Sequence, residues 1–156
     1  MGMRYISVLV TVAFWLSGCT HISGSFISLD GSPGNDLSLV AQIVEDADYP
    51  VLLRGLDGIP LKSVRVPNDF NKYAYLMKPG HHVFWVMNAP YGHPLVPQKI
   101  RCYVIQVELE QSTRYRLKED SVIKRALLLR DDTGAVVSIG QLVDEPWVFL
   151  RSCRWQ

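Results

Sequence analysis

The chain has 156 residues, of which 48% are hydrophobic and 20% are charged, a size and composition that suit one domain with a buried core. Its 16 Lys and Arg nearly balance its 15 Asp and Glu, so the formal net charge is +1. Nucleic-acid-binding proteins normally carry a basic surface, so this balance gives no support for a nucleic-acid partner.

The N-terminus has the pattern of an export signal. Arg4 is the only charged residue before Cys19, and residues 5–16 form a nearly unbroken apolar stretch. This stretch is too short to span about 30 Å of hydrocarbon as a helix. It ends in Leu16-Ser17-Gly18-Cys19, which resembles the lipobox of bacterial lipoproteins. A plain secretory signal with an incidental cysteine and an uncleaved membrane anchor are the alternatives.

The lipobox resemblance implies that residues 1–18 are removed as a signal peptide and that Cys19 is acylated. Two or more acyl chains anchor a protein stably in a membrane. Thr20 after the cysteine, rather than Asp, implies the outer membrane of a Gram-negative envelope, and we expect the domain to face the periplasm, with the cell surface as the alternative. Loss of Arg4 leaves 15 basic and 15 acidic residues, and we therefore expect membrane contact through the acyl chains alone.

Residues 19–36 are rich in Ser, Gly and other polar residues, which predicts a flexible tether. The folded part is then a single domain over residues 37–156. In its first segment, 37–44, alternate residues are apolar as in a strand, but a helix with Asp36 as its N-cap also fits. The strand signals that follow favour a strand.

Strand signals recur along the rest of the chain with turn residues between them. Asp57-Gly58 favours a two-residue hairpin, Lys78-Pro79-Gly80 a tight turn, and residues 131–134 a four-residue hairpin loop. The predicted strands are 51–56, 61–66, 72–77, 82–87, 101–110, 113–117, 123–129, 135–139 and 146–150. Strand 82–87 is apolar on both faces, which is typical of a sheet covered on both sides. We predict an all-β fold, an antiparallel β-sandwich of about eight short strands.

Residues 51–86 also resemble PEGA-type and transthyretin-like modules. The matching features are the Asp57-Gly58 turn and the later sequence Leu76-Met77-Lys78-Pro79-Gly80-His81 before an apolar strand. The second feature has one extra residue before Pro79. This resemblance covers about a quarter of the chain, implies a β-sandwich, and implies nothing about a substrate.

With Cys19 acylated, Cys102 and Cys153 remain as an even pair in an oxidising compartment. We predict a disulfide, which closes a loop of about 50 residues and contributes about 4 kcal/mol in the chain-entropy account. Two buried free thiols are the alternative. Around them Trp147, Phe149, Cys153 and Trp155 alternate, which predicts a core strand at the C-terminus, although Trp155 could be exposed for binding.

Two groups of polar residues are candidate chemical sites. His81 and His82 point to opposite faces of a strand, and His93 lies in a loop, so we expect no metal site. Glu108 and Glu110 share one strand face, as paired catalytic carboxylates do in glycosidases. We expect them instead to form cross-strand ion pairs with Arg114 and Arg116. We identify no catalytic residues and no cofactor.

Residues 88–99 form a long connection with three prolines, and within it Tyr91, His93 and Leu95 are candidate partner-binding residues. A stiff crossover between sheets is the alternative. We expect a non-enzymatic, acyl-anchored envelope lipoprotein that binds a protein or glycan partner. An envelope hydrolase or metal-dependent enzyme, and a subunit of a secretion or surface assembly, are the alternatives.

Overall fold

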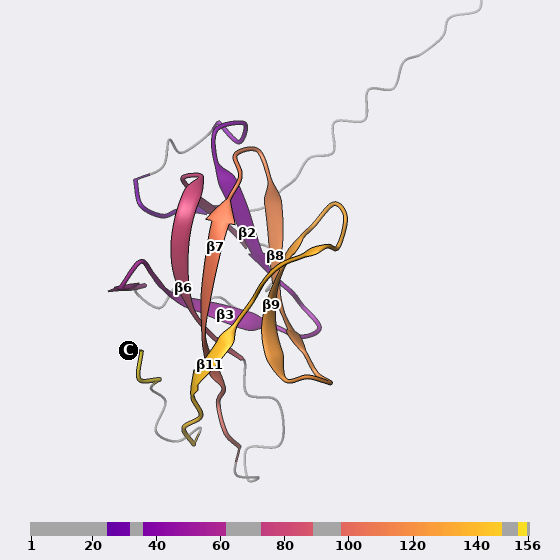
Figure 1. The fold of residues 1–156 in the computed structure, drawn as a ribbon. Coiled ribbons are helices and arrows are strands. Elements are labelled where there is room, and N and C mark those ends of the chain that lie inside the picture. The colour runs from indigo at the N-terminus through magenta and orange to yellow at the C-terminus, as the bar shows by residue number, and fades with distance from the viewer. Residues whose placement is uncertain (1–24, 32–35, 62–72, 89–97, 148–152, 156) are drawn as a thin grey trace, which may run out of the picture.

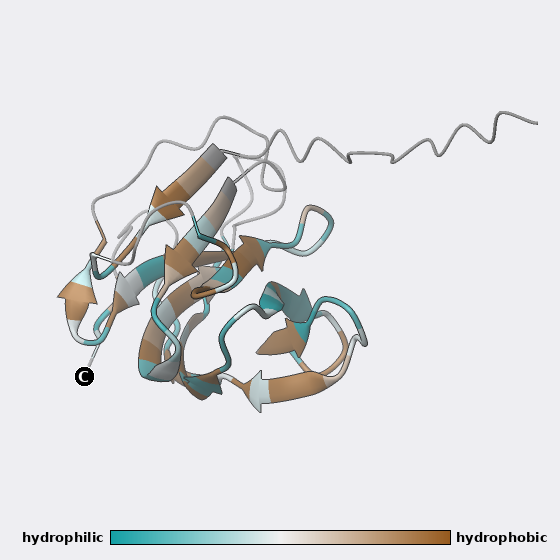
Figure 2. Ribbon diagram, turned by 90° about the horizontal axis from the view of Figure 1, so that it is seen from above, coloured by the Kyte–Doolittle hydropathy of each residue, from teal (hydrophilic) through white to brown (hydrophobic). Residues whose placement is uncertain are grey.

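A computed structural model of the chain describes residues 25–31, 36–61, 73–88, 98–147 and 153–155. These residues form eleven strands in two sheets that pack as a β-sandwich (Figure 1). The predicted all-β sandwich is therefore confirmed, with eleven strands rather than eight. Seen from above, the apolar segments follow the strands and the turns are mostly hydrophilic (Figure 2).

One sheet has six strands and the other has five. The six-stranded sheet contains, in spatial order, β1 (Ser25–Ser28), β5 (Tyr73–Met77), β2 (Ala41–Glu45), β8 (Arg114–Asp120), β9 (Arg125–Arg130) and β10 (Val136–Ile139). The five-stranded sheet contains β11 (Gln141–Asp144), β7 (Cys102–Leu109), β6 (Gly80–Asn88), β3 (Val51–Leu56) and β4 (Ile59–Pro60). Pairing is mostly antiparallel, except that β1 pairs with β5 and β2 with β8 in parallel. Such parallel neighbours cannot be joined by a tight hairpin, and both pairs are far apart in the sequence.

The start of the domain differs from the sequence-based division. Strand β1 lies within the range 19–36 that was assigned to a tether, and Ile27 and Leu29 pack against the core. The ambiguous segment is a strand only over Ala41–Glu45. Asp36 caps a turn rather than a helix, because its Oδ1 accepts hydrogen bonds from the Ser38 N–H at 3.0 Å and from the Ser38 hydroxyl at 2.6 Å.

The core lies between the two sheets and consists of alternate residues of the strands. Its largest fully buried side chains are Tyr103, Tyr115, Phe84, Ile43, Met77, Ile105, Leu117 and Leu128. Strand β6 was expected to be covered on both faces, but its residues alternate between buried and half-buried. Its outer face is thus only partly covered.

The C-terminal segment provides part of that cover. Cys102 and Cys153 form the predicted disulfide, with their Cα atoms 5.9 Å apart. Trp155 stacks on Trp85 of β6, with ring centroids 5.7 Å apart and ring planes 4° from parallel. The predicted packing of Trp155 is therefore confirmed. The predicted core strand at the C-terminus is wrong, because Trp147 is 42% exposed and Cys153–Trp155 is irregular. Phe149 lies outside the described residues.

Two other strand predictions differ from the structure. The return strand predicted at 61–66 is only the two-residue β4, and residues 62–72 lie outside the described part. The single strand predicted at 135–139 is followed by a second one, β11, after Gly140. A Cβ at Gly140 would lie only 3.1–3.2 Å from side-chain atoms of Ala126, Tyr103 and Ile105. The chain therefore passes between the sheets at a point that favours glycine.

Gly55 lies beneath the Trp85 ring, where a Cβ would clash with ring atoms. We therefore expect Gly55→Ala to lower the free energy of unfolding by about 1–3 kcal/mol, as overpacked core positions do. The measurement is urea unfolding. The near-ultraviolet circular dichroism, to which the stacked rings of Trp85 and Trp155 contribute, is a second signal. In a Trp85→Leu background the same substitution should cost much less. Equal costs in the two backgrounds would show that the clash is not with Trp85.

Candidate functional site

The candidate binding residues Tyr91, His93 and Leu95, and the acylation candidate Cys19, lie outside the described residues. The structure does describe the base of the 88–99 connection. The Asn88 N–H donates to the Arg101 carbonyl at 3.1 Å, and the Arg101 N–H donates to Asn88 Oδ1 at 2.7 Å. The two ends of this connection are therefore held together at one end of the sandwich.

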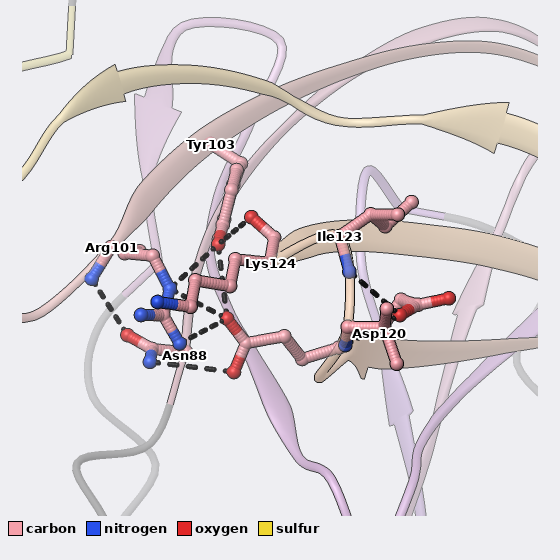
Figure 3. Close-up of polar contacts among 8 residues, drawn as sticks. Asn88, Arg101, Tyr103, Asp120, Ile123 and Lys124 are labelled. Carbon is pink, nitrogen blue, oxygen red and sulfur yellow. Dashed lines mark hydrogen bonds and ion pairs between the residues drawn. The ribbon is translucent and has the colours of Figure 1, made fainter.

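Beneath this base lies a buried carboxylate, Glu119, whose residue is only 7% exposed (Figure 3). Its Oε1 accepts hydrogen bonds from Arg101 Nε at 2.7 Å and from Arg101 Nη2 at 2.6 Å. Asn88 Nδ2 lies 3.4 Å from Oε2. The Tyr103 hydroxyl lies 3.0 Å from both Oε1 and the Lys124 carbonyl, so its single proton serves one acceptor at a time. We call these residues the Glu119 cluster.

The charges of the Glu119 cluster suit a structural role. Burial lowers the pKa of Arg101, but the Glu119 carboxylate raises it by more, so the guanidinium stays charged. Burial and the neighbouring Glu119 charge raise the pKa of Tyr103, so its phenol stays neutral. Neither group can exchange a proton near neutral pH. The cluster therefore holds the backbone at Asn88, Arg101 and Lys124 in place.

His82 also has a structural role. Its Nδ1 lies 2.7 Å from Asp57 Oδ2 and its Nε2 lies 2.9 Å from the Lys78 carbonyl, so both ring nitrogens are occupied. Asp57 also accepts a hydrogen bond from the Val83 N–H at 2.7 Å. These bonds hold the 57–58 hairpin against β6. His81 is exposed, and the described residues contain no group of three side chains that could hold a metal ion.

The predicted pairing of Glu108 and Glu110 with Arg114 and Arg116 is wrong. Strands β7 and β8 belong to different sheets, so the turn between them joins two layers. Arg114 and Arg116 both contact Asp131, at 3.1 Å and 2.6 Å. Glu110 instead binds Arg130 at 2.9 Å, and Glu108 lies opposite His81 on β6. Both glutamates are exposed, Glu108 on β7 and Glu110 just after its end.

A second buried carboxylate, Glu45, was not found from the sequence. It is 3% exposed, its Oε1 accepts the Leu53 N–H at 2.9 Å, and the Tyr75 hydroxyl lies 3.4 Å away. Burial raises the pKa of Glu45, although the Leu53 hydrogen bond and the Arg54 charge act in the opposite direction. It connects β2 to β3 across the two sheets.

The longest run of exposed apolar residues in the described part of the chain extends from β10 to β11. We call it the apolar strip: it consists of Val136, Val137, Ile139, Leu142 and Val143, which are between 38% and 51% exposed. Figure 1 shows this run, in orange to yellow, crossing from β9 to β7. Strand β10 is the last strand of its sheet and β11 is the last strand of the other.

The apolar strip has little of the usual protection of a sheet edge. Proteins normally shield such edges with charged residues or proline, and residues 136–143 contain neither, although β11 ends in Asp144 and the Ser138 hydroxyl of β10 donates to the Gln106 carbonyl of β7 at 2.7 Å. Beside the strip, Gln141–Val143, Asp144 and Arg154 line a partly open hollow of about 460 Å³. Sequence reasoning assigned the residues of 135–139 to a strand but could not show that they face outward. The signal in the sequence that could have indicated this surface is that the apolar residues of 135–139 do not alternate with polar ones.

Comparison with protein-family models, with curated proteins and with solved structures found no match. No helix in the described part of the chain is long and apolar enough to cross a bilayer. The candidate site therefore rests on the geometry alone.

The raised pKa of Glu45 predicts a specific pH dependence. Because the folded-state pKa lies above the ordinary value of 4.5, the stability linked to Glu45 is present below that pH and is lost as the pH rises through the folded pKa. We expect Glu45→Gln to gain stability relative to the native chain between about pH 4 and about pH 7. Urea unfolding at both pH values measures this difference.

The exposed Glu145→Gln variant is the matched control for that measurement, because the carboxylate of Glu145 faces Lys99, which stays charged throughout this pH range. We expect the difference between Glu145→Gln and the native chain to change less with pH than the difference for Glu45→Gln. If the two variants behaved alike, the carboxyl of Glu45 would not be the source of the pH dependence.

Proposed function

We propose that this chain is a lipid-anchored envelope protein that binds a partner protein through the apolar strip. The single observation that supports binding is the strip itself, an uncharged run on two terminal strands of the sandwich. Exposed apolar surfaces of this kind are typical of protein interaction sites. The partner would present an extended apolar segment, either packed on the strip or added to a terminal strand by backbone hydrogen bonds.

The strip is chemically suited to a protein segment. Its five residues are between 38% and 51% exposed, and covering that part would contribute about 1 kcal/mol per residue. A partner segment would also cover backbone groups of β10 and β11 that have no strand on their outer side within the described residues. Sugars, which are mostly polar, would find few hydrogen-bonding side chains on the strip.

The anchor part of the proposal is supported by the sequence Leu16-Ser17-Gly18-Cys19 and by Thr20 after it. An acylated Cys19 would hold the domain at the outer membrane, where the strip is available to envelope proteins. Strand β1 begins at Ser25, six residues after Cys19. The domain would therefore stand close to the membrane surface.

We expect Cys19→Ser to abolish acylation and to move the protein out of the membrane fraction, because no thioether can form. Metabolic labelling with radioactive palmitate and fractionation of the envelope measure both effects. Thr20→Ser, which keeps the cysteine and an uncharged neighbour, should label and fractionate as the native chain does. Unchanged membrane association of Cys19→Ser would contradict the anchor.

Binding at the strip can be tested by placing a photo-crosslinking amino acid at Val137 or Leu142 in intact cells. We expect a discrete adduct with another protein from these two positions, and none from the exposed Thr133 in the turn before β10. Ile139→Lys should reduce the adduct several-fold while the thermal unfolding midpoint stays nearly constant, since its side chain is half exposed.

Two results would contradict this binding proposal. One is the same set of adducts from Thr133 as from the strip, which would indicate random collisions. The other is an adduct of twice the mass of the chain, which would identify a second copy of the chain as the occupant.

A further inference from the structure

The turn between β8 and β9 carries two apolar side chains into solvent. Val122 is 87% exposed, more than any other large hydrophobic residue in the described part of the chain, and Ile123 is 53% exposed. Neither contributes to the core. Their exposed side chains therefore add nothing to the packing of the core.

The turn is held firmly in this position (Figure 3). Asp120 Oδ1 accepts hydrogen bonds from the Val122 N–H at 2.8 Å and from the Ile123 N–H at 3.1 Å. The Lys124 carbonyl lies 3.0 Å from the Tyr103 hydroxyl of the Glu119 cluster, and Lys124 has a φ of +50°. A buried ion pair thus supports a turn whose tip points away from the domain.

Positive charges surround the apolar tip. Lys118, Lys124 and Arg125 make no ion pair within the described residues, and Lys124 and Arg125 are exposed. Of the neighbouring acids, Glu119 pairs with Arg101, Asp120 lies opposite Arg125, and Asp48 precedes Tyr49, whose carbonyl accepts the Glu119 N–H at 2.9 Å. These three acids stand against the four cations Arg101, Lys118, Lys124 and Arg125, so the tip and its surroundings carry a small net positive charge.

We propose that this turn inserts Val122 and Ile123 into a phospholipid surface that contains anionic headgroups. Two aliphatic side chains with adjacent cations match the layered chemistry of such a surface, in which hydrocarbon lies beneath negative charge. The same two residues are far too small a patch for a stable protein interface, which buries about 800 Å² on each partner. The inference rests on the proposed acyl anchor, because so small a contact needs a second attachment to persist.

The fold lets the anchor and the turn reach one surface together. Strand register places Ser25 level with Leu117 of β8, three strands away across the six-stranded sheet. Strand spacing and rise then put Val122 roughly 20 Å from Ser25. The six residues from Cys19 to Ser25 reach roughly 20 Å when extended. The tether is therefore long enough for the tip to touch the membrane in which Cys19 is anchored.

Site-directed spin labelling can test this insertion. The full acylated chain is reconstituted into vesicles of phosphatidylethanolamine and phosphatidylglycerol, with one new cysteine as Val122→Cys or Thr133→Cys. Cys102 and Cys153 form a disulfide, so the new thiol is the one that reacts. We expect the label at 122 to gain several-fold in accessibility to oxygen relative to a water-soluble nickel chelate, while the exposed label at 133 does not change.

Two further variants check the chemistry of the contact. Lys124→Glu together with Arg125→Glu should remove most of the gain at 122. Vesicles of phosphatidylcholine alone should reduce it. Equal accessibility at 122 and 133 in the anionic vesicles would overturn the insertion, as would loss of access at 122 to both reagents, which would indicate contact with protein.

Flotation of the same vesicles separates this inference from the proposed function. A chain that floats with the vesicles but keeps a water-exposed label at 122 would leave the anchor intact and overturn the insertion. A chain that does not float would overturn both.

Discussion

The ion pair between Glu119 and Arg101 connects the two halves of this structure. Glu119 belongs to β8 in the six-stranded sheet, and its partners Asn88, Arg101 and Tyr103 belong to, or directly adjoin, β6 and β7 of the five-stranded sheet. Removing one partner of a buried ion pair generally costs about 3–5 kcal/mol, because the other charge is left without compensation. The base of the 88–99 connection and the β8–β9 turn both depend on this pair.

A few polar and apolar groups of this domain lie against the usual preference, although its core is otherwise apolar. Two carboxylates, Glu45 and Glu119, lie inside and connect the sheets, whereas the apolar strip and the tip of the β8–β9 turn lie outside. Buried polar groups that are fully hydrogen-bonded restrict a core to one arrangement, although they add little to its stability. Exposed apolar groups add nothing to stability either. The buried carboxylates are therefore better explained by the way they fix the two sheets relative to each other than by a contribution to stability. The exposed apolar residues are better explained by binding.

Several parts of the fold could be predicted from local sequence. The alternation of residues in β7 and β8, the Asp57-Gly58 turn, and the Cys102–Cys153 pair each depend on nearby residues or on simple counting. The layer to which a strand belongs could not be predicted, because a short turn permits either a hairpin within one sheet or a step between sheets. For this reason Arg114 and Arg116 were paired with the wrong acids.

The candidate surfaces were harder to predict than the strands. An apolar residue in a strand is normally assigned to the core, so the outward orientation of Val136, Ile139 and Leu142 has no signature in the sequence. The step at Gly140 produces it, since the chain changes sheets there and leaves both flanking strands as the last of their sheets. Glu45 was missed for the converse reason, because a charged residue at a strand end is normally assigned to solvent.

The disulfide has a consequence for the order in which the molecule matures. Cys102 and Cys153 enclose the part of the chain from β7 to β11, which contains both the apolar strip and the β8–β9 turn. A crosslink acts chiefly by limiting the freedom of the unfolded chain within the loop that it closes. Oxidation therefore favours the folded state of the very segment that displays exposed apolar residues. In a reducing compartment that segment lacks this constraint. The folded conformation of the residues that carry the apolar strip and the β8–β9 turn therefore gains this stabilisation only after the thiols are oxidised.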